Sequence, residues 1–430
     1  MNISVVGAGY VGLTWAAVLA DLGHKVWVVR KDKEKNEALK NGKIHFFEPG
    51  LEELVKNSLK NSQLFPTTDY SEAIPNSELI FICVGTPSLS SGSIDLSQVF
   101  TAAEEVGKSL KKGFTLVVSK STIPPGTTKQ VKKIIEKNKN DKANFEVAFC
   151  PEFLREGSAV ADTRRPDRVI IGSETVKASE ILQKFHKDFK APIFITKIAS
   201  AELIKYASNN YLALRIVLAN QIADLCEESE ADINEVIEGM GMDKRIGSHY
   251  WYPGLGYGGS CFPKDVAALA AYARQAGIKG SLFEKIDELN AQRIGKILQK
   301  VKKNIGGFSK KTIGVLGLAC KRGTDDVRKS PAIKVVELLQ KDKVRIKAYD
   351  PLAMKNAAKV LTGVDFCQDA YQVAEKADAL FILNDTEAYV QLDYKKIKKL
   401  MREKFIFDSR NLLNKREVEK LGFKYQGIGK

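Results

Sequence analysis

A glycine pattern at the start of the chain restricts its fold more than any other stretch. The apolar run NISVVG (residues 2–7) predicts a short buried strand, and TWAAVLADLG predicts a helix that follows directly. Between them stands G-x-G-x-x-G, formed by Gly7, Ala8, Gly9, Tyr10, Val11 and Gly12. At a strand-to-helix turn this spacing is typical of a βαβ unit that binds a dinucleotide, with the phosphates at the positive end of the helix.

Each glycine of this pattern has an expected role. Gly7 permits the tight turn, Gly9 lets the backbone approach a pyrophosphate, and Gly12 lets the helix meet the strand. A flavin cofactor would satisfy the pattern too, but we find no second flavin feature. We therefore predict a nicotinamide-dinucleotide site, with Tyr10 and Val11 as part of it.

The end of the second predicted strand, KVWVVR (residues 25–30), leaves the type of nicotinamide cofactor open. An acidic residue commonly stands there and binds the ribose hydroxyls, whereas this chain has Arg30, followed by Asp32 two places later. An arginine suits the 2′-phosphate of NADP. Alternatively, Asp32 takes the acidic role after a small loop shift, and Arg30 stacks on adenine. We expect NAD, with NADP as the alternative.

Strands and helices alternate in two separate parts of the chain. The expected strands of the first part include ELIFICVGTP, TLVVSKSTIPPGTT, EVAFCPEF and RVIIG, and those of the second include KTIGVLGLACK, RIKAYDP, ADALFIL and KFIFDSR. This alternation predicts an α/β fold with parallel, doubly wound sheets that bind ligands at the carboxyl ends of their strands. We predict an NAD(P)-binding Rossmann domain at residues 1–198 and a second Rossmann-like domain at residues 311–430.

The segment between these two parts, residues 199–303, is expected to be helical. SAELIKYASNNYLALRIVLANQIADLCEESE is apolar-periodic without Gly or Pro, which predicts one helix of about 30 residues. So long an apolar helix between two domains favours a homodimer interface, although it could instead pack only within its own chain. We predict a central helical dimerisation and catalytic domain, with GFSKK (residues 307–311) as the linker after it.

Composition narrows the function. The net charge is +15, but the lysines are spread among glutamates, which favours a solvated surface over nucleic-acid binding. The six cysteines form no CxxC pair and the four histidines lack ligand spacing, so we expect no metal. No apolar run approaches the ~20 residues of a membrane helix. The first residues lack the order of a signal peptide, so we expect a cytoplasmic protein.

Residues 254–265, GLGYGGSCFPKD, place a cysteine after four glycines. Most lone cysteines are buried core residues, and a tight turn around a buried thiol is one interpretation. The other is a reactive site, because Gly256, Gly258 and Gly259 would leave space for a ligand to reach the backbone. On this hypothesis Cys261 is a nucleophile.

The residues after the cysteine support the reactive interpretation. Pro263 suits the first turn of the helix predicted for DVAALAAYA, which places Cys261 near a helix N-terminus. That position and Lys264 would lower the pKa of the Cys261 thiol. Asp265 could act as a base or hold a water molecule.

The predicted long helix adds a cation and an amide. Lys205 and Asn209 are four residues apart, so both lie on one face of that helix. Together they could stabilise a negatively charged oxygen. An exposed polar face would show the same spacing.

These residues together resemble the UDP-glucose/GDP-mannose dehydrogenase family of nucleotide-sugar 6-dehydrogenases. The shared motifs occur in the family's order through nearly the whole chain: GAGYVGL, VGTP, STIPPGT, PEFLREGSA, IKYASNN, GLGYGGSCFPKD and GLACKRGTDDVRKSPA. The resemblance implies a dinucleotide domain, a helical dimerisation core and a UDP-sugar-binding domain. It is closest to the members that act on UDP-glucose, and it implies oxidation of the sugar C6 alcohol to a carboxylate by two nicotinamide cofactors in turn.

The resemblance also implies individual roles. The implied catalytic residues are the nucleophile Cys261, its helpers Lys205, Asn209 and Asp265, and Thr122 and Glu152, which are linked to the water and to thioester hydrolysis. The implied cofactor contacts, beyond the glycine turn, Arg30 and Asp32, are Lys35, Thr86, Glu156, Lys264 and Arg328. The implied substrate contacts are Phe153, Leu154, Arg155, Glu156, Lys205, Arg245, Tyr250, Tyr252, Gly254, Gly258, Lys321 and Arg410. Arg245 resembles an arginine that reaches the substrate of the neighbouring subunit.

Three departures from the family pattern qualify this implication. Arg30 replaces the usual acidic residue, Cys320 stands where an aromatic is common, and Lys329 replaces a frequent glutamate. The last two bear on uridine or interdomain contacts. UDP-glucose is the expected substrate; GDP-mannose, a UDP-N-acetylhexosamine, and a non-catalytic nucleotide-sugar-binding protein are the alternatives.

Overall fold

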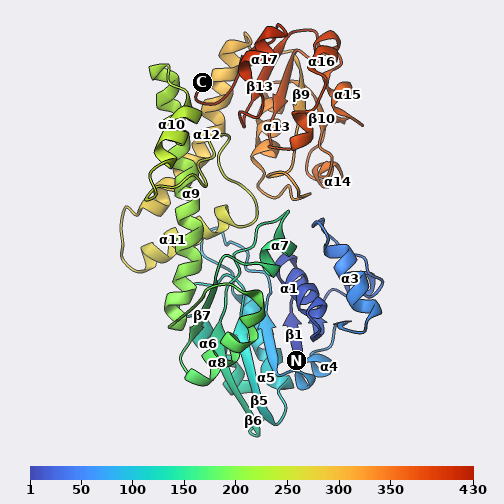
Figure 1. Cartoon of the computed structure of the whole chain (residues 1–430), viewed down its shortest axis with the longest axis vertical. Coiled ribbons are helices and arrows are strands. Elements are labelled where there is room, and N and C mark those ends of the chain that lie inside the picture. Colours follow the sequence, from blue (N-terminus) through green and yellow to red (C-terminus); the bar gives the residue numbers. More distant parts are fainter. The chain divides into compact units, whose positions relative to one another are not determined.

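The computed structural model describes residues 1–430, which fold into two compact units. The first comprises Met1–Ser208 with Ala271–Ala276, and the second comprises Asn209–Ala270 with Gly277–Lys430. Each unit contains a β-sheet flanked by helices (Figure 1). The predicted α/β fold class is confirmed. The predicted division into three domains is finer than these two units and stays a prediction.

The sheet of the first unit has eight strands in the order β3-β2-β1-β4-β5-β6-β7-β8. Their bounds are β1 (Asn2–Val6), β2 (Lys25–Val29), β3 (Leu64–Thr67), β4 (Leu79–Ile82), β5 (Gly113–Ser119), β6 (Ala143–Phe149), β7 (Val169–Ser173) and β8 (Ile193–Thr196). Neighbours pair in parallel except β7, which is antiparallel to β6 and so departs from the expected all-parallel sheet. The order in which strands are added to the sheet reverses between β1 and β4, and such sheets bind ligands at this point.

The helices of the first unit cover both faces of this sheet. They are α1 (Tyr10–Asp21), α2 (Lys33–Lys40), α3 (Leu51–Lys60), α4 (Tyr70–Ala73), α5 (Ser97–Ser109), α6 (Thr127–Asn138), α7 (Ala159–Arg164) and α8 (Val176–Phe185), with short 3₁₀ turns η1 (Ile74–Asn76) and η2 (Lys187–Phe189). The central strands β1 and β4 are almost wholly buried, because apolar residues point to both faces. The resulting core fixes the strand ends from which the site residues project.

The second unit contains a six-stranded parallel sheet in the order β11-β10-β9-β12-β13-β14. Its strands are β9 (Thr312–Leu316), β10 (Arg345–Tyr349), β11 (Val364–Phe366), β12 (Ala379–Ile382), β13 (Phe405–Asp408) and β14 (Lys424–Gln426). Its helices include α10 (Ile233–Gly241), α12 (Leu282–Asn304), α13 (Pro331–Lys341), α14 (Met354–Ala357), α15 (Ala370–Ala374), α16 (Tyr394–Leu400), α17 (Lys415–Lys420) and η3 (Glu387–Tyr389). This strand order also reverses at its first strand, so the prediction of a second Rossmann-like sheet is confirmed.

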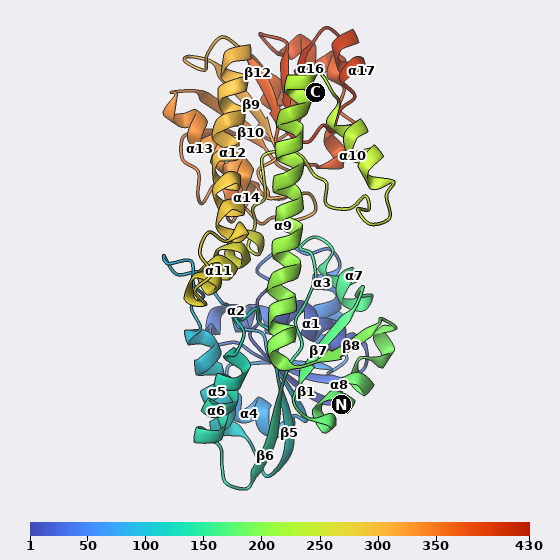
Figure 2. The same ribbon diagram turned by 90° about the vertical axis from the view of Figure 1, so that its left-hand side faces the viewer.

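The predicted long helix forms as α9 (Ile198–Ser229), 32 residues without interruption (Figure 2). Its first turns pack in the first unit, where a Cβ added to Gly172 would lie 2.7 Å from the Ala201 Cβ. Within the second unit, Ala213 and Val217 of α9 share an apolar cluster with Val266 of α11 (Phe262–Gln275). No helix is both long and apolar enough to cross a membrane.

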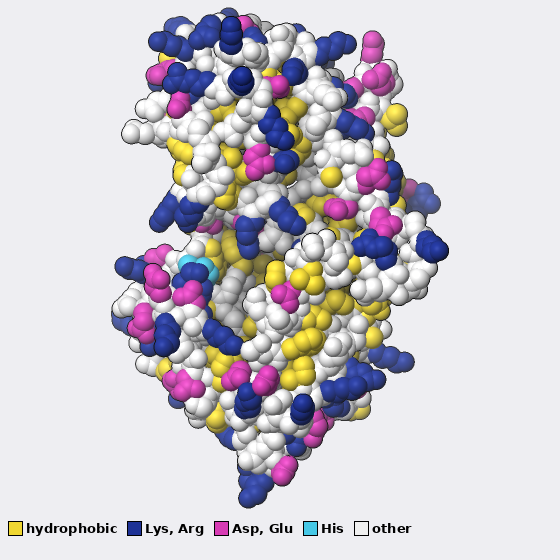
Figure 3. All heavy atoms as spheres, turned by 180° about the vertical axis from the view of Figure 1, so that it is seen from behind, with side chains coloured by type: hydrophobic (Ala, Val, Ile, Leu, Met, Phe, Trp, Pro, Cys, Tyr) yellow, Lys and Arg dark blue, Asp and Glu magenta, His cyan; other side chains and the backbone are white.

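The expected linker at residues 307–311 connects α12 to β9, and it is anchored rather than loose. Its Phe308 is only 2% exposed and belongs to the core of the second unit. On the face drawn in Figure 3, lysine and arginine side chains are spread widely and alternate with acidic ones. That arrangement is typical of a solvated surface, as the composition indicates.

Candidate active site

The glycine turn after β1 has the geometry that its sequence predicts. Gly7 has φ +106°, and a Cβ there would lie 2.6 Å from the Cys83 carbonyl oxygen at the end of β4. A Cβ on Gly12 would overlap the Gly7 carbonyl oxygen, so the helix can pack here only without a side chain. A Cβ on Gly9 would meet nothing within 4 Å. Gly9 also precedes the first residue of α1, so the open space lies at the helix N-terminus, which fits a pyrophosphate.

Tyr10 fixes the neighbouring loop instead of pointing freely into this space. Its hydroxyl donates to the Phe47 carbonyl oxygen at 2.6 Å, and its ring stacks on Phe46 with the centroids 4.2 Å apart. Val11 is partly buried in the first turn of α1. Both residues therefore shape the glycine turn, and their contact with a cofactor stays a prediction.

Arg30 lies against the glycine turn. Its Nη1 donates to the Ala8 carbonyl oxygen at 2.9 Å and lies 3.2 Å from His45 Nδ1. Burial lowers the pKa of His45 to about 4, so this imidazole is neutral at pH 7 and can accept the bond. Arg30 thus already has partners within the unit.

Asp32 serves as the N-cap of α2. Its carboxylate accepts from the Lys35 backbone N–H at 3.0 Å and pairs with the Lys35 Nζ at 3.1 Å. These hydrogen bonds lower the pKa of Asp32, so it is ionised at neutral pH. The structure places Arg30, Asp32 and Lys35 after the end of β2, and their contact with a ribose stays a prediction.

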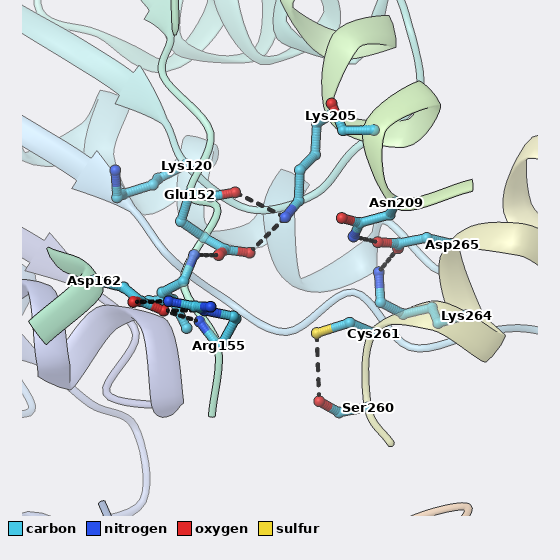
Figure 4. Close-up of polar contacts among 12 residues, drawn as sticks. Lys120, Glu152, Arg155, Asp162, Lys205, Asn209, Ser260, Cys261, Lys264 and Asp265 are labelled. Carbon is cyan, nitrogen blue, oxygen red and sulfur yellow. Dashed lines mark hydrogen bonds and ion pairs between the residues drawn. The ribbon is translucent and has the colours of Figure 1, made fainter. Parts of the chain in front are cut away.

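A buried ion pair joins α9 to the segment that follows β6 (Figure 4). Lys205 Nζ donates to the Glu152 carbonyl oxygen at 2.7 Å and to its carboxylate at 2.9 Å. The two side chains are 4% and 10% exposed, so the pair is shielded from water. Glu152 also accepts from the Leu154 N–H at 2.9 Å. The structure thus brings together two predicted catalytic residues, 53 positions apart in the sequence.

Glu202, one turn before Lys205, is a residue that the sequence patterns did not single out. Its carboxylate is fully buried and accepts from the backbone N–H groups of Gly126 at 2.6 Å and Thr128 at 2.8 Å. Burial raises the pKa of Glu202, although these N–H groups oppose the rise. Through these hydrogen bonds α9 holds the turn after Thr122 in place, so Glu202 is a positioning residue for that loop.

Glu48 plays a similar part for the segment after Glu152. It is 3% exposed and accepts from the backbone N–H groups of Gly157 at 2.7 Å and Ala159 at 2.6 Å. It therefore caps the start of α7 and fixes the loop that contains Phe153, Leu154 and Glu156. No local pattern reveals Glu48 or Glu202, since their partners are backbone groups more than 70 positions away.

The second unit holds the other group of predicted catalytic residues (Figure 4). Asn209 Nδ2 donates to the Asp265 carboxylate at 2.5 Å, and Lys264 Nζ donates to the other Asp265 oxygen at 2.6 Å. Asp265 is 1% exposed. Its position at the first turn of α11 supplies a further favourable interaction for its negative charge. A buried carboxylate held by an amide and an ammonium can hold or move a proton at a defined place.

Cys261 directly precedes α11, whose first residue is Phe262, so the prediction that this thiol lies at a helix N-terminus is confirmed. It is exposed, whereas four of the other five cysteines are buried and Cys320 is partly exposed. Burial raises the pKa of the Cys83 thiol to about 12 and also raises the pKa of Cys150. Of the six thiols, Cys261 is therefore the one best placed to meet a substrate. The Ser260 Oγ lies 3.5 Å from its sulfur.

The glycines before Cys261 lack side chains because other parts of the protein pack against them, not because a ligand needs the space. A Cβ on Gly256 would overlap the Asn290 amide, and one on Gly258 would overlap the Lys329 carbonyl oxygen. The space beside these two glycines is filled by the protein itself, so the expectation that they leave room for a ligand is wrong. Gly259, with φ +83°, is less crowded: the nearest atoms, of Cys320, lie 4.0 Å from its Cβ position.

Gly254 is enclosed in the same way. Its N–H donates to Asn220 at 2.8 Å, its carbonyl oxygen accepts from Arg293 at 3.1 Å, and a Cβ would lie 2.8 Å from the Ser409 carbonyl oxygen. The glycine-rich segment therefore packs tightly against α9, α12 and the end of β13. It positions Cys261 by close backbone packing, and any substrate contact at Gly254 or Gly258 stays a prediction.

The remaining predicted site residues lie on loops near the strand ends. In the first unit, Thr86 is buried after β4 and Thr122 is partly buried after β5. Arg155 points to Asp162, with its Nη2 2.7 Å from that carboxylate. These positions meet at the carboxyl edge of the sheet, where the fold predicts a ligand.

In the second unit, Arg245 is the most exposed of the predicted arginines, with a side chain 90% exposed and bonded to Asp243 at 2.6 Å. Arg328 pairs with Asp326 at 2.7 Å. Lys321 and Arg410 are partly exposed, after β9 and β13. The rings of Tyr250 and Tyr252 lie 5.4 Å apart. Contacts of these residues with a nucleotide sugar remain predictions.

Comparison with known proteins matches three successive segments of the chain to one family. Residues 1–190 match the NAD binding domain of the UDP-glucose/GDP-mannose dehydrogenase family, residues 199–292 its central domain, and residues 314–415 its UDP binding domain. These segments contain most of the residues described above.

Individual relatives agree over full length. The chain is 41% identical over 430 residues to UDP-glucose 6-dehydrogenase TuaD of Bacillus subtilis (strain 168), covering 100% of this chain and 93% of that protein. It is 43% identical over 437 residues to UDP-glucose 6-dehydrogenase of Rhizobium meliloti (strain 1021), covering 100% of both. The structure of a UDP-glucose dehydrogenase from the hyperthermophilic archaeon Pyrobaculum islandicum matches with a TM-score of 0.93 at 37% identity, covering 100% and 97% of the two chains.

Proposed function

Because the chain belongs to the UDP-glucose/GDP-mannose dehydrogenase family, we propose that it oxidises the C6 alcohol of UDP-glucose to the carboxylate of UDP-glucuronate. It is a dehydrogenase of this family, and its first unit is an NAD-binding domain. The observation that carries the proposal is the exposed thiol of Cys261 at the start of α11, beside the buried Asn209–Asp265–Lys264 group. The names of the relatives support UDP-glucose as the substrate.

The thiol explains how one site removes two electron pairs. Two NAD molecules, held one after the other at the glycine turn, would each accept one hydride. The first hydride leaves C6 while the hydroxyl proton is released, which gives an aldehyde. The Cys261 thiol then adds across the carbonyl bond, with the sulfur on the carbon and the proton on the oxygen, so that the carbon is again tetrahedral and can give up its hydrogen as a hydride. Loss of the second hydride leaves a thioester on Cys261, and water breaks the carbon–sulfur bond to give the acid and the thiol.

The polar residues supply the proton transfers and the charge that these steps need. Asp265, directly or through a water molecule, accepts the proton from the sugar hydroxyl. Lys205 and Asn209 stabilise the negative charge that develops on the C6 oxygen. Glu152 and Thr122 position the water that cleaves the thioester. The buried bonds of Lys205 and Asp265 hold these groups in place before substrate binds.

The stoichiometry of the reaction tests this proposal. Two NAD molecules should be reduced for each acid released from UDP-glucose, with no free aldehyde, and the absorbance of NADH together with a chromatographic assay of UDP-glucuronate gives both numbers. GDP-mannose and UDP-N-acetylhexosamines serve as the competing substrates. Faster acid formation from one of those would reassign the substrate, and absence of acid from all of them would reject the enzymatic proposal.

Cofactor preference gives a second prediction. We expect kcat/KM with NAD to exceed that with NADP by about tenfold or more, because Arg30 is already bonded to Ala8 and faces His45, while Asp32 lies ionised nearby. Initial rates with both cofactors at saturating UDP-glucose measure the ratio. Equal or better use of NADP would show that Arg30 leaves these partners to bind the 2′-phosphate.

The homodimer expected from the long helix is also part of the proposal. On the second-unit part of α9, Tyr211, Leu218 and Leu225 are 55%, 43% and 68% exposed. A spacing of seven residues keeps side chains on nearly one line along a helix, so the three form an apolar stripe. The stripe suits a second copy of α9. The cytoplasmic location remains a prediction.

Charges placed in this stripe should separate the dimer. We expect the double variant Leu218→Glu, Leu225→Glu to elute as a monomer, because two copies would bring four carboxylates into an apolar interface. Light scattering after size exclusion measures the mass. Val390→Glu is the matched control, since Val390 is 47% exposed but lies outside α9. An unchanged mass of the double variant would place the interface elsewhere or show a monomeric parent.

A further inference from the structure

The first unit contains a cavity of about 120 Å³ behind the segment that follows β6. Its walls include Trp15 of α1, Lys120 after β5, Cys150 after β6, and His186 at the end of α8. None of these four residues belongs to the predicted cofactor, substrate or catalytic set. The opposite wall does, since Glu152, Phe153, Leu154 and Arg155 also line the cavity.

Lys120 is the unusual group in this cavity. Lys120 is only 5% exposed. Its Nζ donates one long hydrogen bond, of 3.4 Å, to the Cys150 carbonyl oxygen. The ammonium also lies over the Trp15 ring, 4.1 Å from the centroid. Two carboxylates of the cavity wall pair with other cations, Glu152 with Lys205 and Asp162 with Arg155. Buried lysines normally have a charged or strongly polar partner of their own. Three N–H donors thus face one weak acceptor and an aromatic ring.

A second unsatisfied donor lines the same cavity. Trp15 is 5% exposed, and its indole Nε1–H has no hydrogen-bond partner. Buried indole N–H groups usually find one. Lys120 and Trp15 therefore offer a charged donor and a neutral donor with no acceptor of matching strength among the side chains around them.

Asp167, the third carboxylate of the cavity wall, belongs to an exposed residue, and the remaining polar side chains carry no negative charge. His186 bonds the Leu182 carbonyl oxygen through Nδ1 at 2.8 Å, and its Nε2 lies 3.8 Å from the Cys150 sulfur. Burial lowers the pKa of His186 to about 3 and raises the pKa of the Cys150 thiol, so both groups are neutral at pH 7. Arg168 also lines the cavity, and its guanidinium stacks on Phe153 at 3.9 Å from the ring centroid.

We propose that this cavity is a binding site for a small carboxylate monoanion, held by the Lys120 ammonium and the Trp15 indole N–H. A carboxylate has two oxygens, one for each donor, and its negative charge would compensate the charge of the Lys120 ammonium. The small volume admits an anion of the size of formate or acetate but not a nucleotide. Glu152 and Phe153 line the same cavity, so an occupant would contact the segment that carries the partner of Lys205.

Thermal unfolding of the full chain at constant ionic strength tests this site. Sodium formate and sodium acetate are the probes, and the sodium salt of a bulky sulfonate buffer is the reference that cannot enter the cavity. We expect a saturable rise in Tm with either carboxylate for the parent protein, because a ligand that binds only the folded state stabilises it. Lys120→Met should fold, because an apolar chain of similar length replaces a buried cation. We expect it to bind formate and acetate at least about tenfold more weakly than the parent.

Two further variants make the result specific. Trp15→Phe keeps the aromatic ring and removes the N–H, so we expect binding about fivefold weaker. Lys132→Met makes the same charge change on the exposed face of α6 and should leave the rise in Tm unchanged. A rise that is equal in the parent and in Lys120→Met, or no rise in the parent, would overturn the proposal. If Lys120→Met does not fold, an unweakened response of Trp15→Phe would overturn it.

The result is independent of the proposed sugar oxidation. Binding is measured without NAD or a nucleotide sugar, so failure of the carboxylate site leaves the dehydrogenase proposal intact. Conversely, a protein that binds acetate in this cavity but oxidises no nucleotide sugar would refute only the latter.

Discussion

Cys261→Ser is expected to lower the rate of UDP-glucuronate formation by about a thousandfold or more. A serine hydroxyl has nearly the same size and keeps the position before α11, but it is a much weaker nucleophile than a thiol or thiolate. The variant should therefore form little of the covalent adduct that makes the second hydride transfer possible. We expect at most about one NADH per active site, with the substrate stalled at the aldehyde stage, as measured by stopped-flow absorbance.

Mass spectrometry of the parent enzyme complements the variant. Acid quenching during turnover should leave the mass of the oxidised sugar nucleotide on the peptide that contains Cys261, and the variant should lose the thioester species. Cys320→Ser is the matched control, because the Cys320 sulfur is partly exposed and its bond to the Arg328 carbonyl oxygen can be kept by a hydroxyl. Full acid production by Cys261→Ser would reject covalent catalysis at this residue.

The glycine turn shows how much a local pattern can predict. Gly7, Gly9 and Gly12 have three different environments, and each is the one that its place in G-x-G-x-x-G requires. The strand, turn and helix are contiguous in sequence, so the positive φ of Gly7 and the close approach of Gly12 to Gly7 follow from local backbone sterics. The contact of Gly7 with Cys83 also needs the pairing of β1 with β4. The same holds for α9 and for the place of Cys261 before α11, where apolar periodicity and a proline define the helices.

The glycines at 256 and 258 show where the same reasoning fails. A missing side chain indicates close approach, but the sequence does not say whether the neighbour is a ligand or the protein. Here it is Asn290 and Lys329, which are distant in sequence. Glu48 and Glu202 were missed for a related reason, since their roles depend on backbone N–H groups that only the tertiary fold brings near.

Lys205→Ala is expected to lower kcat by about a hundredfold to a thousandfold while changing the KM for UDP-glucose by less than about threefold. In the proposed mechanism this residue offers its ammonium to the oxygen on which negative charge develops, and such an interaction strengthens only as the reaction proceeds. In the structure the Lys205 side chain is 4% exposed, and its ammonium is held by the Glu152 carbonyl and carboxylate. Steady-state rates with UDP-glucose and NAD separate the two parameters.

A structural role for the same lysine has to be distinguished, because its removal leaves the Glu152 carboxylate buried beside an empty space. We therefore pair Lys205→Ala with Glu152→Gln, which breaks the ion pair but keeps the Lys205 ammonium, and with Lys197→Ala, an exposed lysine just before α9. If Lys205 acts on the substrate oxygen, the first hydride transfer should be faster in Glu152→Gln than in Lys205→Ala. In Lys197→Ala this rate should equal that of the parent. If Lys205→Ala instead raised KM at constant kcat, the lysine would serve binding alone, and the stabilisation of the C6 oxygen would have to come from Asn209.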